Sequence, residues 1–192
     1  MSLPEGWQEQ LEDAQRLRGW IVNSFAQVEF LLGDLILRCR EFPAYEEHTR
    51  TLPHGASDRI ARVRTILNRS GPLDPDANDI LAILDHLAAQ QDTRNLLVHG
   101  FATALHTSSE EMGFHFQKFH RQPGRHDARL IRTFTLDGLR REREDQTAFA
   151  EAAVGRFQAM HRRMGWEGPM SDEFLGDAPF EAGRCSDTPS RS

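Results

Sequence analysis

Three residue types are scarce in this sequence, and each scarcity narrows the classes of protein that it can encode. The 192 residues include two cysteines, one tyrosine and a single lysine, Lys118. The two cysteines, Cys39 and Cys185, provide neither a disulfide framework nor the spacing of a metal site. With one lysine, nearly all positive charge is arginine, which binds phosphate groups well but is also frequent where a genome favours arginine codons.

Long apolar runs and a basic net charge are also missing. No apolar run approaches the ~20 residues of a membrane span, and the first residues lack the basic and apolar regions of a signal peptide. We therefore expect a cytoplasmic protein without a membrane partner. The formal net charge of -6 argues against a general nucleic-acid-binding surface, although it leaves room for a local one.

Length and composition predict a single domain followed by a tail. A content of 39% hydrophobic and 27% charged residues is ordinary for a globular protein, and the chain is long enough for a core. Glycine, proline, serine and acidic residues dominate from Trp166 onward. We expect a domain over residues 1–165 and a mobile tail over residues 166–192.

Apolar residues recur every three or four positions through most of the chain, which predicts helices. The expected helices run over about residues 5–40, from Ser57 to near Gly71, and over about 74–100 and 135–164. The first of them is apolar nearly all round in its second half, as in a central helix packed on several sides. Capping residues support these ends: Ser57-Asp58, Asp74-Pro75 and Thr135 at the starts, and Gly100 and Gly165 at the stops.

After Gly100 the period of the apolar residues changes toward two. Residues 101–106, 112–120 and 129–135 read as short strands that are separated by turn residues. The sequence thus predicts a mainly α fold, an antiparallel helical bundle with a small antiparallel β meander, about 101–135, inserted before the last long helix.

The most informative segment is Arg94-Asn95-Leu96-Leu97-Val98-His99-Gly100, at the end of a predicted helix. On a helical projection Asn95 falls inside the apolar stripe, and Arg94 and His99 flank it. A carboxamide or guanidinium buried without partners costs roughly 1–3 kcal/mol, so we expect this helix end to face a site or a partner subunit. The predicted apolar stripe consists of Ile80, Leu84, Leu87, Ala88 and Val98, with Gln91 also inside it.

The spacing Arg-x4-His occurs three times, but only this copy has Asn after the Arg, an apolar triplet and Gly after the His. This combination resembles the signature of the HEPN superfamily of small α-helical domains in prokaryotic defence and toxin systems. The likeness extends to residues 24–33, where Glu29 stands among apolar residues, and covers residues 6–164. It implies a bundle that pairs with a second copy so that both motifs face one cleft, and in many members a ribonuclease that needs no metal or other cofactor. Phe101 stands where one branch has a tyrosine that accepts a nucleotide, so we do not expect that regulation here.

The motif contains the groups that metal-independent RNA cleavage requires. An imidazole such as His99 can exchange protons near neutral pH, the Arg94 guanidinium can hold phosphate oxygens, and Asn95 can orient either. A helix C-terminus favours a cation, which suits His99 as an acid or phosphate clamp better than as a base, so its role stays open between them. Glu29 is either a surface carboxylate or a salt-bridge partner of one of the many arginines, or it has a role in holding Arg94 or His99.

Other residues of the meander give weaker signals. His115 and His120 fall on opposite faces of one strand, so we expect no metal site. We expect Phe114, Phe116 and Phe119 to pack on the bundle rather than to stack on nucleic-acid bases.

Our leading hypothesis is a metal-independent endoribonuclease of the HEPN type, a toxin or phage-defence effector that acts on RNA as a homodimer. The partners expected besides RNA are a cognate antitoxin or a regulatory protein. The alternative is a non-catalytic HEPN-like module that binds RNA, a nucleotide or a protein through the same groove. A third possibility is a dimerisation module in which Arg94 and Asn95 only satisfy buried groups.

Overall fold

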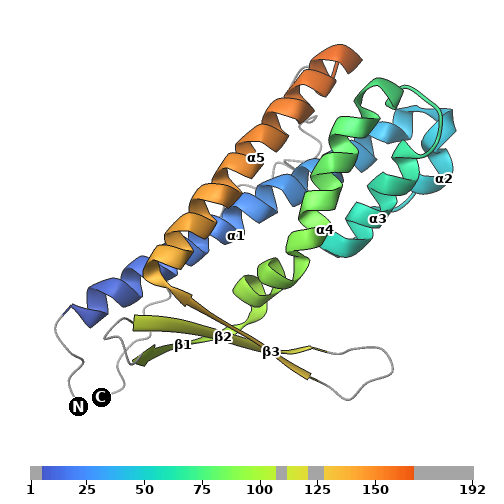
Figure 1. The fold of residues 1–192 in the computed structure, drawn as a ribbon. Coiled ribbons are helices and arrows are strands. Elements are labelled where there is room, and N and C mark those ends of the chain that lie inside the picture. The colour runs from blue at the N-terminus through green and yellow to red at the C-terminus, as the bar shows by residue number, and fades with distance from the viewer. Residues whose placement is uncertain (1–5, 107–111, 121–127, 167–192) are drawn as a thin grey trace, which may run out of the picture.

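The computed structural model describes residues 6–106, 112–120 and 128–166, and it shows a bundle of helices seated on a small sheet (Figure 1). The helices are α1 (Trp7–Arg38), α2 (Glu46–Thr49), α3 (Ala56–Leu67), α4 (Ala77–His99) and α5 (Leu136–Met164). Short 3₁₀ turns, η1 (Cys39–Glu41), η2 (Pro43–Tyr45) and η3 (Asp74–Asp76), connect them. The strands are β1 (Phe101–His106), β2 (Met112–His120) and β3 (Ala128–Thr135).

Helix α1 is the centre of the bundle, as its apolar sequence predicts. Helix α5 packs along it, and α3 and α4 also contact it (Figure 1). One part of the described chain, Trp7–Glu41, is long and apolar enough by composition to cross a membrane. Because 56% of its apolar window is buried inside the bundle, the same composition serves a core helix, and it is weak evidence for a membrane span.

The predicted ends of the last helix are confirmed, whereas two predicted N-caps are wrong. The Thr135 hydroxyl accepts a hydrogen bond from the Gly138 N–H at 3.0 Å, and Gly165 ends α5 with a left-handed φ of 68°. Helix α3 begins one residue before Ser57, without a side-chain cap. Asp74 accepts from the Gly71 N–H at 2.9 Å, so its carboxylate stabilises the preceding turn rather than capping α4.

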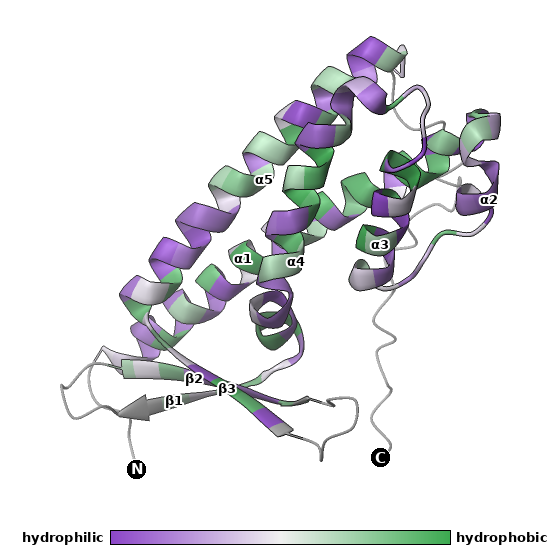
Figure 2. Ribbon diagram, turned by 45° about the vertical axis from the view of Figure 1, so that its right-hand side comes forward, coloured by the Kyte–Doolittle hydropathy of each residue, from purple (hydrophilic) through white to green (hydrophobic). Residues whose placement is uncertain are grey.

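The predicted meander is confirmed as a three-stranded antiparallel sheet in the order β1-β2-β3. Side chains alternate along β2, and those of Met112, Phe114 and Phe116 are buried on the side of the helices. Phe134 of β3 pairs in register with Phe114 and joins the same core. Figure 2 shows the sheet below the bundle, so that its other side faces away from the helices.

The buried face of α4 differs from the predicted stripe. Near the C-terminus the buried side chains are those of Thr93, Leu96 and Leu97, while Val98 is half-buried and Ala88 is exposed. The spacing of the buried residues in the N-terminal half would place the next buried positions two residues away from these. This difference corresponds to a rotation of the buried face by roughly 200° about the helix axis. The reason is a change of neighbour, because the last turns of α4 reach β2 below the bundle (Figure 1). The N-terminal half buries Ile80, Ile83, Leu84 and Leu87.

Trp166 belongs to the packed body, one residue beyond the predicted domain boundary. Its side chain is only 7% exposed, and its ring lies 6.1 Å from that of Phe42 and 5.5 Å from that of His161. The remainder of the expected tail, residues 167–192, lies outside the described residues.

Beside Trp166, a buried imidazole predicts a pH-dependent stability. Burial lowers the pKa of His161, Asp34 raises it, and Arg38 lowers it further. The His161 Nε2 atom lies 3.3 Å from an Asp34 oxygen but makes no hydrogen bond. Because the unfolded chain then binds a proton more readily than the native one, the free energy of unfolding should fall as the pH drops below about 6.5.

Urea titrations above and below that pH measure this dependence. We expect His161→Gln to weaken it and His54→Ala, at an exposed position, to leave it unchanged. An undiminished pH dependence in His161→Gln would assign the effect to other groups.

Candidate functional site

The Arg94 guanidinium is held by a carboxylate and by its own neighbour. Its Nε and Nη2 atoms donate to the two carboxylate oxygens of Glu29, at 2.7 and 2.9 Å, and its Nη1 donates to Asn95 Oδ1 at 3.0 Å. Glu29 is 8% exposed, and it reaches Arg94 from α1 across the helix interface. Glu29 is therefore not a surface carboxylate, and of the expected alternatives the structure shows the one in which it holds Arg94. Such a two-pronged contact fixes the plane of the guanidinium.

His99 lies apart from this cluster. It is the last residue of α4 and exposed, and no hydrogen bond joins it to Arg94 or Asn95 among the described residues. Asn95 stands one turn before His99, so the two side chains leave neighbouring positions on the helix surface. The structure thus joins Glu29, Arg94 and Asn95 into one network and places His99 next to it, at the helix end.

Arg18 of α1 fixes the end of α4, and we did not predict this contact. Its guanidinium donates to the carbonyl oxygens of Leu97 at 2.6 Å, Val98 at 3.4 Å and Gly100 at 3.2 Å. The last carbonyls of a helix have no partner within it, and Arg18 supplies donors to them. A signal existed in the sequence for Arg18 itself, which lies four residues after Ala14 and three before Ile21, on the apolar face of α1.

Gly100 allows the chain to turn directly from helix to strand. Its N–H donates to the Leu96 carbonyl oxygen at 2.7 Å, and its backbone is extended, with φ -75° and ψ 141°. A β-carbon at this position would collide with the same carbonyl oxygen of Leu96. This contact gives a physical reason for the glycine that follows the motif histidine.

A second unpredicted contact ties the motif helix to the sheet. Arg132 of β3 donates to the Thr93 hydroxyl at 2.6 Å, and its guanidinium lies 4.9 Å from the centre of the Phe134 ring. Thr93 is buried beside Arg94, so the helix end is held from both α1 and β3.

His99 opens onto a groove of about 550 Å³. It is lined by His99, Phe101, Gln117, Lys118, Phe119 and Arg129. Phe119 is 84% exposed and Phe101 is 65% exposed, which corrects our expectation that Phe119 packs on the bundle. The correction follows from strand alternation, because Phe119 is an odd number of residues from Phe116 and so faces the other side.

The ring Nδ1 of His115 lies 3.0 Å from the Thr133 hydroxyl. Among the described residues, no group of three His, Cys, Asp or Glu side chains could hold a metal ion.

Cys39 is buried, and burial raises its pKa to about 12, which keeps the thiol protonated and unreactive.

The fold and site together define a mainly α-helical domain with a three-stranded antiparallel sheet inserted before its last helix. Comparison of the chain with protein-family models, curated proteins and solved structures found no match.

Proposed function

We propose that the protein is a metal-independent endoribonuclease of the HEPN type, with its active site at the C-terminal end of α4. The observation that carries the proposal is the exposed imidazole of His99, at the mouth of a groove and one turn from an Arg94–Asn95 pair that Glu29 holds in place. A proton-exchanging group and a fixed cation at the end of one helix are the two kinds of group that phosphodiester cleavage needs.

The residues would share the work as follows. The ribose 2'-hydroxyl attacks phosphorus, the bond to the 5'-oxygen breaks, and the products are a cyclic phosphate and a 5'-hydroxyl. His99 either takes the proton of the attacking hydroxyl or gives a proton to the leaving oxygen, and water makes the other of these two transfers. Arg94 uses three of its five N–H groups on Glu29 and Asn95, and the other two can hold phosphate oxygens.

The proposal includes a homodimer in the cytoplasm, acting in defence or as a toxin under the control of a cognate protein. Trp20 and Phe30 on α1 are each 57% exposed, more than large apolar side chains usually are. A shallow groove of about 300 Å³ lies between α1 and the end of α4. These features support a second copy next to the motif helix.

The test is RNA cleavage in the presence of a chelator, with the full chain. We expect His99→Ala to lower the rate by about a hundredfold or more, the usual loss for a positioned acid or base, with an unchanged melting temperature. His54→Ala, another exposed histidine, is the matched control and should keep full activity. Wild-type protein that is inert on every RNA tried, or equal activity in His99→Ala, would contradict the proposal.

A non-catalytic binding module is the second candidate, and one observation favours it. Three of the five Arg94 donors are already occupied within the protein, as in a structural arginine. If this reading is correct, purified protein binds RNA or a nucleotide without cleaving it, and Arg94→Ala acts through stability alone.

A further inference from the structure

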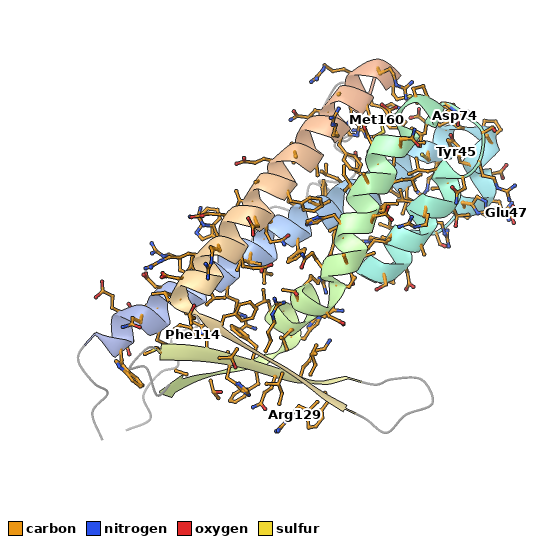
Figure 3. The ribbon with its side chains drawn as sticks, viewed as in Figure 1. Tyr45, Glu47, Asp74, Phe114, Arg129 and Met160 are labelled. Atoms are coloured by element: carbon orange, nitrogen blue, oxygen red, sulfur yellow. The ribbon has the colours of Figure 1, made fainter. Side chains whose placement is uncertain are left out.

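The face of the sheet that points away from the helices carries a second group of residues that suit nucleic acid. In the strand register Phe101 pairs with Gln117, and Phe119 pairs with Arg129. Paired residues lie on the same face, so the two phenylalanines are diagonal neighbours, roughly 7–8 Å apart. Figure 3 shows Arg129 on this side of the sheet and Phe114 on the side of the helices.

Exposed apolar side chains gather on one part of this outer face. Besides Phe101 and Phe119, Ile131 is 40% exposed and pairs in register with Gln117. The other face of the sheet, by contrast, buries its aromatic side chains Phe114 and Phe116. The three apolar side chains therefore form a patch that a ligand with flat rings can cover.

The charge of the sheet is opposite to that of the whole chain. The described strand residues 101–106, 112–120 and 128–135 include no aspartate or glutamate. Of their three cations, Arg129 lies on the outer face, whereas Lys118 and Arg132 lie on the side of the helices. The chain as a whole has a net charge of -6. A polyanion would therefore be attracted to the sheet and repelled by much of the remaining surface.

We propose that the outer face of the sheet binds single-stranded RNA, with bases stacked on Phe101 and Phe119 and phosphates held by Arg129 on that face. Lys118 leaves β2 on the opposite face, but it lines the same groove as His99 and can hold a further phosphate there. Stacking on exposed rings requires unpaired bases, because the base faces of a duplex are already covered by their neighbours. Single-stranded RNA would then be the substrate form of the proposed ribonuclease, and this inference rests on that proposed function for the cleavage that follows binding.

The outer face of the sheet and the motif Arg94–Gly100 are adjacent along the chain. Only Gly100 separates His99 from Phe101, and both residues line the same groove. A strand whose base stacks on Phe101 would therefore place a neighbouring phosphate within the groove that contains the His99 imidazole.

Fluorescence anisotropy with a short labelled RNA of mixed sequence tests the proposal. All riboses carry 2'-O-methyl groups, so the probe cannot be cleaved and binding is measured whether or not the protein is an enzyme. We expect the single strand to bind more tightly than its duplex, and Phe101→Ala/Phe119→Ala to weaken binding by about tenfold or more. Arg129→Ala should lower the dependence of affinity on salt concentration.

Arg50→Ala is the control, because it removes an exposed cation directly after α2, at the end of the bundle away from the sheet (Figure 1). It should leave RNA affinity unchanged, and melting temperatures show whether all variants remain folded. Undetectable binding, preference for the duplex, or equal affinity in Phe101→Ala/Phe119→Ala would overturn the proposal. A dimer that Phe119→Ala dissociates, without RNA binding, would assign this face to a second copy.

The outcomes also separate this inference from the proposed function. Binding of the uncleavable strand without cleavage of ordinary RNA would leave RNA binding by the outer face in place and contradict the ribonuclease. Cleavage whose rate and KM are unchanged in Phe101→Ala/Phe119→Ala would contradict RNA binding by the outer face and leave the ribonuclease in place.

Discussion

Replacing Glu29 by alanine should lower the free energy of unfolding by about 3 kcal/mol, a large part of the stability of an ordinary domain. The side chains of Glu29 and Arg94 are only 10% and 19% exposed, so solvent replaces little of what is lost. Without the carboxylate, the guanidinium keeps its charge in a partly buried place and loses two hydrogen-bond acceptors. Urea unfolding of wild type and variant measures the difference.

A double-mutant cycle separates the pair from its surroundings. Glu29→Ala/Arg94→Ala should be less destabilised than the sum of the single variants, because removal of both partners leaves no unpaired charge. The pair of Arg64 with Asp85, whose side chains are 38% and 69% exposed, is the matched control. Arg64→Ala should cost less than about 1 kcal/mol. Additive effects at Glu29 and Arg94 would show that the two residues act independently.

The same variants distinguish two roles for Arg94. If it also stabilises charge during cleavage, Arg94→Ala should reduce the rate per folded molecule by about a hundredfold or more, beyond its effect on stability. If it serves the fold alone, the activity per folded molecule stays the same.

The second large effect should come from Arg18→Ala, which we expect to destabilise the protein by about 3 kcal/mol. Three carbonyl oxygens at the end of α4 then lose a charged donor, and Phe116 loses the guanidinium that lies 5.5 Å from its ring centre. Thermal and urea unfolding measure the loss, and hydrogen exchange should show it first in the last turn of α4.

Arg16→Ala is the control for Arg18→Ala. It lies on the same helix, its side chain is 69% exposed, and its ion pair with Asp13 is local. We expect little change there. If the two variants are equally stable, the carbonyl contacts of Arg18 do not hold the helix end.

Much of the fold could be predicted from local pattern. The strand bounds agree with the structure to within one residue, because the change of period after Gly100 and the turn residues are local signals. The last helix was equally well defined by Thr135 and Gly165, which cap it in the structure as predicted. Glu29 also stood out, as an acidic residue at the edge of a buried stripe.

The remaining features depend on which elements meet in space. Helical phase could not choose the partner of Glu29 among many arginines, because that choice follows from how α1 packs on α4. The buried stripe of α4 was extended through Val98 on the assumption of one neighbour, whereas the helix has different neighbours at its two ends. The partners of Arg18 are backbone atoms about 80 residues away, which leave no trace in side-chain spacing. The exposure of Phe119, in contrast, could have been predicted from the sequence, because alternation along β2 places it on the face that points away from the helices.

The short connections at either end of the sheet leave it no hinge. Gly100 alone stands between α4 and β1, and α5 begins at the residue after β3 ends. Arg132 adds a cross-link from β3 to the buried Thr93. A force that acts on β1 or β3 is therefore transmitted directly to the end of α4 and to the start of α5. Anyone who wishes to graft this sheet onto another scaffold should expect to transplant α4 and α5 with it.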